Sequence, residues 1–124
     1  MNASNAQSKV SPGTHVSAAP LAAFVRDSIG QTQIVHVLGE IDLSNAPELE
    51  AEIAQLEGPG NVIVDLTGCT YVDSTGLGII ATAQKRLNDR LRLVVPNGPL
   101  LRIFDICGLV PHLNPVPTLE EALA

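Results

Sequence analysis

A strand followed by a helix is encoded by NVIVDLTGCTYVDSTGLG, residues 61–78, together with the residues just after it. The apolar, β-branched run at residues 61–66 is typical of a buried strand. Beyond the polar turn, apolar residues recur at the spacing of a helix, at Leu77, Ile80 and Leu87. The segment therefore predicts one strand–helix unit of an α/β fold.

A hairpin and a helix are predicted upstream of this unit. Residues 24–29 and 33–38 are short β-rich runs, and Gly30-Gln31-Thr32 between them favours a turn. Asn45 with Glu48 three residues later predicts a capping box that opens the helix NAPELEAEIAQLE. The buried stripe of this helix is predicted to comprise Ala46, Leu49, Ile53 and Leu56, whereas Glu48, Glu50 and Glu52 are expected to face water.

A further strand and two more helices are predicted downstream. LRLVVP, residues 91–96, is typical of a strand, and a helix begins near Pro99 with Cys107 on its buried face. After a short extended piece at residues 112–116, Thr118 opens a final helix in a second capping box. Strands alternating with helices predict an α/β fold with a small mixed, mostly parallel sheet of roughly four to five strands and about four helices.

Composition limits the chain to one small acidic domain. It has 124 residues and 13.0 kDa, with 7 Lys and Arg against 13 Asp and Glu, a formal net charge of −6. No basic stripe offsets this balance and aromatic residues are only 2%, so nucleic-acid binding is not expected. No apolar run approaches the ~20 residues of a membrane span. Cys69 and Cys107 fit neither a disulfide framework nor a metal site.

The domain is expected to occupy residues 21–124. Residues 1–20 contain Ser, Ala, Asn and Pro with almost no bulky apolar side chains. Such a segment cannot offset its ordering entropy by burial, which predicts a flexible tail. The polar outer faces of the predicted helices favour a monomer, and the composition favours a cytoplasmic protein.

DSTGLG, residues 73–78, is the segment with potential chemistry. The carboxyl ends of parallel strands share one edge of an α/β sheet, so Asp42 and Ser74 are expected to approach one another. The Ser74 hydroxyl could cap the following helix, or a phosphate there would be held by free amides and the helix dipole. Gly76 and Gly78 remove side chains around this hydroxyl, which would let another protein's active site approach. A helix cap and a kinase substrate both fit this pattern.

Three stretches, in order, carry a resemblance to a known family. VIVDLTGCTYVDSTGLG is preceded by LGEIDLSNAPEL and followed by LRLVVPNGPLLRIFDICGL. Together they resemble the STAS domain of bacterial anti-sigma-factor antagonists, from about Phe24 to the C-terminus. The DSTGLG turn is the most specific piece, and GEID at residues 39–42 agrees with it in order and spacing. The resemblance implies a STAS-like fold.

The resemblance also implies roles for individual residues. In that family the serine directly after the aspartate is phosphorylated by an anti-sigma factor that is also a serine kinase, which places this role on Ser74. The unmodified antagonist binds the anti-sigma factor and frees the sigma factor, and a PP2C-type phosphatase reverses the modification. The family's aspartate near the phosphorylated turn would be Asp42. The residues expected to contact the partner are Asp42, Asp73, Ser74, Thr75, Gly76, Leu77 and Gly78.

The expected function is that of a binding module switched by phosphorylation, not an enzyme, with no cofactor and no metal. The chain has no P-loop, kinase loop or nucleotide-binding signature, so ATP and Mg²⁺ would belong to the partner. The alternative is a STAS subunit with a structural or ligand-sensing role in a larger assembly, such as a transport system. A serine hydrolase is more remote, because Val72 stands where a nucleophile elbow needs glycine. Asp73 could orient the Ser74 hydroxyl or cap the helix.

Overall fold

Six strands and the helices around them form an α/β structure in the part of the chain that the computed structural model describes, residues 15–56 and 58–124. The strands are β1 (His15–Ala19), β2 (Ala22–Ile29), β3 (Thr32–Ile41), β4 (Val62–Asp65), β5 (Cys69–Val72) and β6 (Leu91–Val94). The helices are α2 (Ala46–Ala54), α3 (Ser74–Leu87), the 3₁₀-helix η1 (Asn88–Arg90), α4 (Pro99–Ile106), α5 (Val110–Leu113) and α6 (Leu119–Leu123).

The sheet is mixed, with the order β1-β2-β3-β4-β6. The pairs β1–β2 and β2–β3 are antiparallel, whereas β3–β4 and β4–β6 are parallel. The short β5 pairs in parallel with β3 beyond the part of β3 that β4 covers. The predicted hairpin and the mixed, mostly parallel α/β fold are confirmed. The sequence reading did not assign β1 and β5 as strands.

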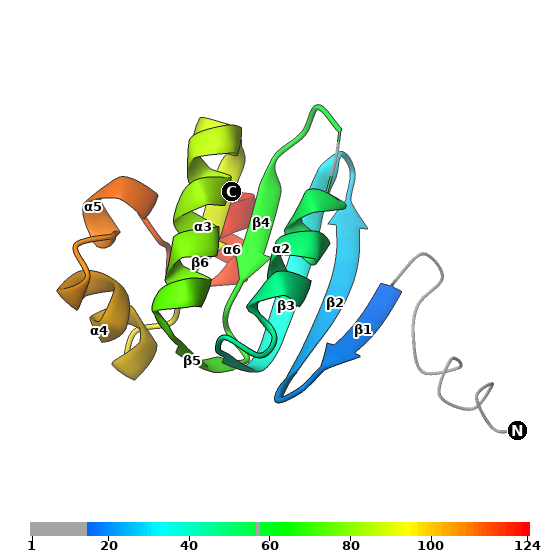
Figure 1. Ribbon diagram of the computed structural model, residues 1–124. Helices are drawn as coiled ribbons and strands as arrows, with labels where there is room; N and C mark the ends of the chain where they lie inside the picture. Colours follow the sequence, from blue (N-terminus) through cyan, green and yellow to red (C-terminus); the bar gives the residue numbers. More distant parts are fainter. Residues whose placement is uncertain (1–14, 57) are drawn as a thin grey trace, which may run out of the picture.

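Alternating strand residues divide the core between the two faces of the sheet. Phe24 and Val37 lie opposite each other in register and pack on the face that α2 and α3 cover (Figure 1). Ile34 and Ile63 pack with Ala122 of α6 on the other face. The predicted stripe is buried as expected: Ala46, Leu49 and Ile53 lie in α2, and Leu56 follows the end of this helix at Ala54.

The first strand lies inside the segment that the sequence predicts to be a tail. That prediction is wrong for His15–Ala19, which form β1, so the ordered domain begins before residue 21. β1 pairs with β2 from His15–Arg26 to Ala19–Ala22, and backbone hydrogen bonds of a ladder need no bulky side chains. Residues 1–14 lie outside the described residues.

Two predictions for α2 are wrong. Asn45 precedes the helix but its side chain makes no cap. Its Oδ1 accepts from the Asp42 N–H at 3.0 Å, and its Nδ2 donates to the Pro20 and Glu40 carbonyls, so loop contacts occupy the amide. Glu52 is buried rather than solvated, because it pairs with Arg26 at 3.1 Å and accepts from the Ser17 hydroxyl at 2.9 Å.

Two predictions near the C-terminus also differ from the structure. Cys107 is exposed, because α4 ends at Ile106 and Cys107 lies just past the buried face. The extended piece predicted at residues 112–116 overlaps the short helix α5, which covers residues 110–113. Only its end is extended, where Val116 makes a parallel bridge to Val94. Thr118 caps α6 as predicted, accepting from the Glu121 N–H at 3.2 Å.

Candidate functional site

Ser74 is the first residue of α3 and is exposed. The residue that caps the helix is Asp73, whose Oδ1 accepts from the Gly76 N–H at 3.1 Å. The Asp73 carbonyl also accepts from the Leu77 N–H at 2.9 Å. Of the two roles considered for Asp73, the structure shows capping, and Ser74 itself is not the cap.

The carboxyl ends of β3 and β5 bring the two acidic loops together. Ile41 and Val72 are partners in register, and the Asp73 N–H donates to the Ile41 carbonyl at 3.0 Å. Asp42 and Asp73 therefore leave neighbouring parallel strands at one edge, the lower edge in Figure 1. The strand that leads to Ser74 is β5, an extra strand after the predicted strand at residues 61–66.

The Asp42 carboxylate is engaged within its own loop. Its Oδ1 accepts from the Ser44 N–H at 2.9 Å and from the Ser44 hydroxyl. The hydroxyl first, and then the backbone N–H, lowers the pKa of Asp42 below its ordinary value, since both bonds favour the charged form. Among the described side chains, no hydrogen bond joins Asp42 to Ser74, although both residues lie at this edge.

The two glycines of the turn have different roles. A Cβ on Gly76 would lie 2.6 Å from Val72 Cγ1 and 2.7 Å from Ile41 Cγ2. Glycine is required there because the start of α3 packs against the ends of β3 and β5. A Cβ on Gly78 would meet nothing within 4 Å, so this face of α3 is open beside Ser74. Gly78 therefore leaves space for another protein's active site, as expected, whereas Gly76 is needed for the packing of α3 against β3 and β5.

Burial separates the seven residues expected to contact a partner. Ser74 and Gly78 are exposed, and Asp42, Asp73 and Thr75 are half-buried. Gly76 and Leu77 are buried, so they shape the turn from beneath and do not offer direct contact.

Sequence reasoning missed three exposed apolar side chains at the same edge. Leu21 is 63% exposed, Leu43 73% and Tyr71 45%. Leu21 lies in the β1–β2 turn, Leu43 directly follows Asp42, and Tyr71 is in β5. The sequence carries one signal of this exposure: Leu43 is apolar but lies between the polar residues Asp42 and Ser44.

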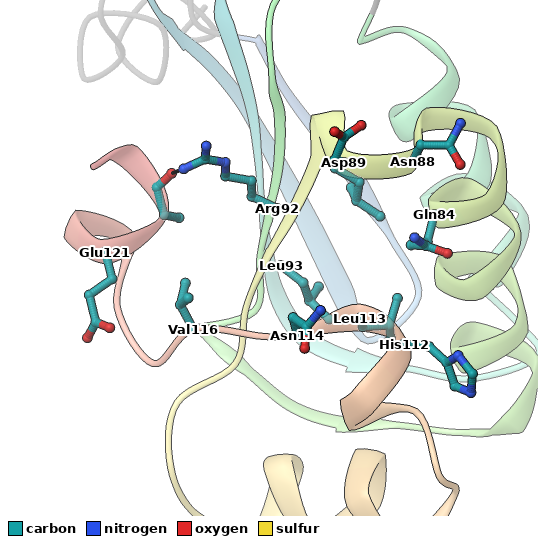
Figure 2. Close-up of a pocket in the computed structure, with 12 residues that line it drawn as sticks. Gln84, Asn88, Asp89, Arg92, Leu93, His112, Leu113, Asn114, Val116 and Glu121 are labelled. Carbon is teal, nitrogen blue, oxygen red and sulfur yellow. Dashed lines mark hydrogen bonds between the residues drawn. The ribbon is translucent and has the colours of Figure 1, made fainter.

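A cavity of ≈ 500 Å³ lies away from this edge, between β6, the C-terminal end of α3, α5 and α6 (Figure 2). Gln84 of α3 and Asn88 of η1 line it together with His112 of α5 and with Asn114, and Ser74 is not part of its lining. Among the described residues, no group of three or more His, Cys, Asp or Glu could hold a metal ion. In the same part of the chain, no helix has the length and apolar character to cross a membrane.

Comparison with known proteins identifies the family. The family model of the STAS domain matches residues 23–122. The chain belongs to the STAS domain family. This confirms the resemblance and the fold that the sequence motifs imply. The match begins after β1 and after Leu21, so the β1–β2 turn lies outside it.

Three similar proteins carry related names. The anti-sigma-B factor antagonist of Staphylococcus epidermidis is 38% identical to this STAS-domain chain over 87 residues, which are 64% of this chain and 81% of that protein. The anti-sigma-B factor antagonist of Staphylococcus aureus (strain NCTC 8325 / PS 47) is 34% identical over the same shares. The crystal structure of an anti-sigma factor antagonist from Mycobacterium paratuberculosis is 28% identical, with a TM-score of 0.78 over 86% of this chain and 95% of that one.

Proposed function

We propose that this STAS-domain chain is an anti-sigma-factor antagonist whose binding is switched at Ser74. In the unmodified form it binds an anti-sigma factor that is also a serine kinase, and the sigma factor is released. Phosphorylation of Ser74 switches this binding off, and a PP2C-type phosphatase restores it. The observation that carries the proposal is the exposed Ser74 at the start of α3, in a chain similar to proteins named anti-sigma-B factor antagonists.

The position of the Ser74 hydroxyl suits a kinase substrate. Asp73 already caps α3, so the helix does not need this hydroxyl. Among the described residues, no hydrogen bond occupies the Ser74 side chain, and open space lies beside Gly78 one turn along the helix. A kinase can therefore reach the hydroxyl without unfolding the turn.

A phosphate on Ser74 would change the surface more than the fold. Phosphoserine carries about −1.5 to −2 charges at neutral pH. Its repulsion from an adjacent carboxylate such as Asp73, about 1.5–2 kcal/mol at a separation of ~4 Å in water, is partly offset by the helix N-terminus, which favours anions by about 0.3–1 kcal/mol. A partner packed on this edge without a cation opposite Ser74 would have to desolvate the phosphate unpaired, which costs several kcal/mol. The effect of phosphorylation therefore falls on binding.

The chain acts as a regulatory binding module and not as an enzyme. A serine hydrolase would need a histidine base beside Ser74. Instead, His36 Nδ1 lies 2.7 Å from Asp65 Oδ2 between β3 and β4, and His112 lines the cavity near the other end of α3. The ATP and Mg²⁺ of the phosphoryl transfer belong to the partner kinase, which shares the cytoplasm with this chain.

Phosphorylation by a purified anti-sigma serine kinase tests the assignment of the site. Wild type, Ser74→Ala and Ser28→Ala are compared by intact-mass spectrometry after incubation with ATP. One phosphate is expected on wild type and on Ser28→Ala, because Ser28 is exposed in β2 far from the turn, and none on Ser74→Ala. A phosphate on the Ser74→Ala variant would refute the assignment.

A further inference from the structure

The β1–β2 turn is fixed against the loops that frame Ser74. The Glu40 N–H donates to the Leu21 carbonyl at 2.9 Å, and Asn45 Nδ2 donates to the Pro20 carbonyl. A Cβ on Gly39 would lie 2.2 Å from the Leu21 oxygen, so only glycine permits this approach. Leu21 has a φ of 65°, a left-handed conformation that is unfavourable for leucine. The turn is therefore held in one position despite its strained backbone.

Two leucines project from this frame into solvent. Leu21 is 63% exposed and Leu43 is 73% exposed. Both leucines lie beside the end of β3: Leu21 is on the side of β2, and Leu43 is in the loop that follows β3. The strand β5, which leads to Ser74, lies on the opposite side of β3. Neighbouring strands are about 4.8 Å apart. All three residues therefore fit within one protein interface of about 800 Å² per partner.

The charge around the two leucines is of one sign. The segments 20–21, 39–45 and 71–78 contain Glu40, Asp42 and Asp73 but no Lys or Arg. The basic residues of α3 and η1 lie at the opposite end of that helix, at Lys85, Arg86 and Arg90. A complementary partner surface would carry an apolar depression for the leucines and basic side chains opposite Glu40 and Asp42. It would carry none opposite the Ser74 hydroxyl, where a cation would pair a phosphate and retain it.

We propose that Leu21 and Leu43 form a docking pair that seats the anti-sigma kinase beside Ser74. The inference rests on the proposed function and names the contact that precedes phosphoryl transfer. Leu21 lies just before residues 23–122, which match the STAS domain, and its turn is held by the β1–β2 ladder. Burial of an exposed apolar side chain in a partner's pocket removes its apolar surface from water, which favours binding.

Steady-state phosphorylation tests the docking pair. The probes are the purified serine-kinase anti-sigma factors of the organism that carries this chain, each with ATP. The variants are Leu21→Asn, Leu43→Asn and the control Ile29→Asn. Asparagine suits the left-handed backbone of Leu21. Ile29 is 53% exposed at the far end of β2, so it matches the leucines in chemistry but not in place.

The docking pair predicts a change in KM and not in kcat. With the kinase that modifies wild type at Ser74, Leu21→Asn and Leu43→Asn should each raise KM about tenfold, while kcat and the KM of Ile29→Asn stay within about twofold of wild type. An unchanged KM in either leucine variant overturns the docking pair and leaves the proposed function intact. Absence of phosphorylation in wild type with every kinase overturns the proposed function, and the docking pair with it.

Discussion

The two glycines of the Ser74 turn provide a matched pair of substitutions. Gly76→Ala places a methyl group 2.6 Å from Val72 Cγ1 and 2.7 Å from Ile41 Cγ2, about 1 Å inside normal contact. Relief of such overpacking costs about 1–3 kcal/mol. Gly78→Ala places its methyl group in open space. Both positions are within α3, where alanine is favoured over glycine by about 1 kcal/mol.

The difference between the two variants isolates the steric cost, because the helix-propensity gain largely cancels. Gly78→Ala should be more stable than wild type by about 0.5–1 kcal/mol, and Gly76→Ala less stable than Gly78→Ala by about 1–3 kcal/mol. Urea unfolding followed by circular dichroism measures both, and an unchanged slope confirms that the unfolded states are comparable. Equal stability of the two variants would refute the packing role of Gly76.

Three further predictions concern side chains around the sheet and the turn. Glu52→Gln should lower the free energy of unfolding by about 2 kcal/mol, because it leaves the half-buried Arg26 guanidinium without its carboxylate. Urea titration measures this change, and equal stability of the variant and wild type would show that the ion pair contributes nothing. Asp73→Ala should cost about 1 kcal/mol in the same assay through loss of the α3 cap, with Asp73→Asn retaining most of the stability, and an equal loss in both variants would argue against capping. Ser44→Ala should raise the pKa of Asp42 toward its ordinary value of 3.8, measured by NMR titration of the carboxyl carbon. Because the pKa of Asp42 is depressed in the folded chain, the ionised carboxylate contributes stability above pH 3.8. This contribution is lost as the pH falls through the lowered pKa. An acid-unfolding curve that Ser44→Ala leaves unchanged would contradict this linkage.

The long periodic segments could be predicted from sequence, because their patterns are set by the core they bury. The buried residues predicted for the helix after Pro47 and for α3, the latter at Leu77, Ile80 and Leu87, match the structure for this reason. β5 could not be predicted, since it has four residues and its central pair is exposed. β1 has small and polar residues and exists through its ladder with β2, which no local pattern reveals.

The site was predictable as a motif but not as a surface. DSTGLG identifies the turn, yet whether Asp73 or Ser74 caps α3 depends on the geometry of the first helical turn. Asn45 has the local pattern of a cap, but partners distant in sequence, such as the Pro20 carbonyl, take its side chain. Leu43 differs from a core leucine only in what surrounds it, so its exposure required the structure.

The affinity of the anti-sigma kinase for the unmodified and the Ser74-phosphorylated chain tests the central claim most directly. The phosphorylated form is prepared with the kinase itself, purified, and compared with the unmodified form by isothermal titration calorimetry at one salt concentration. Switching by phosphorylation predicts an affinity at least about tenfold weaker for the phosphorylated form, within the range of regulatory coupling energies. Equal affinity of the two forms would contradict the account.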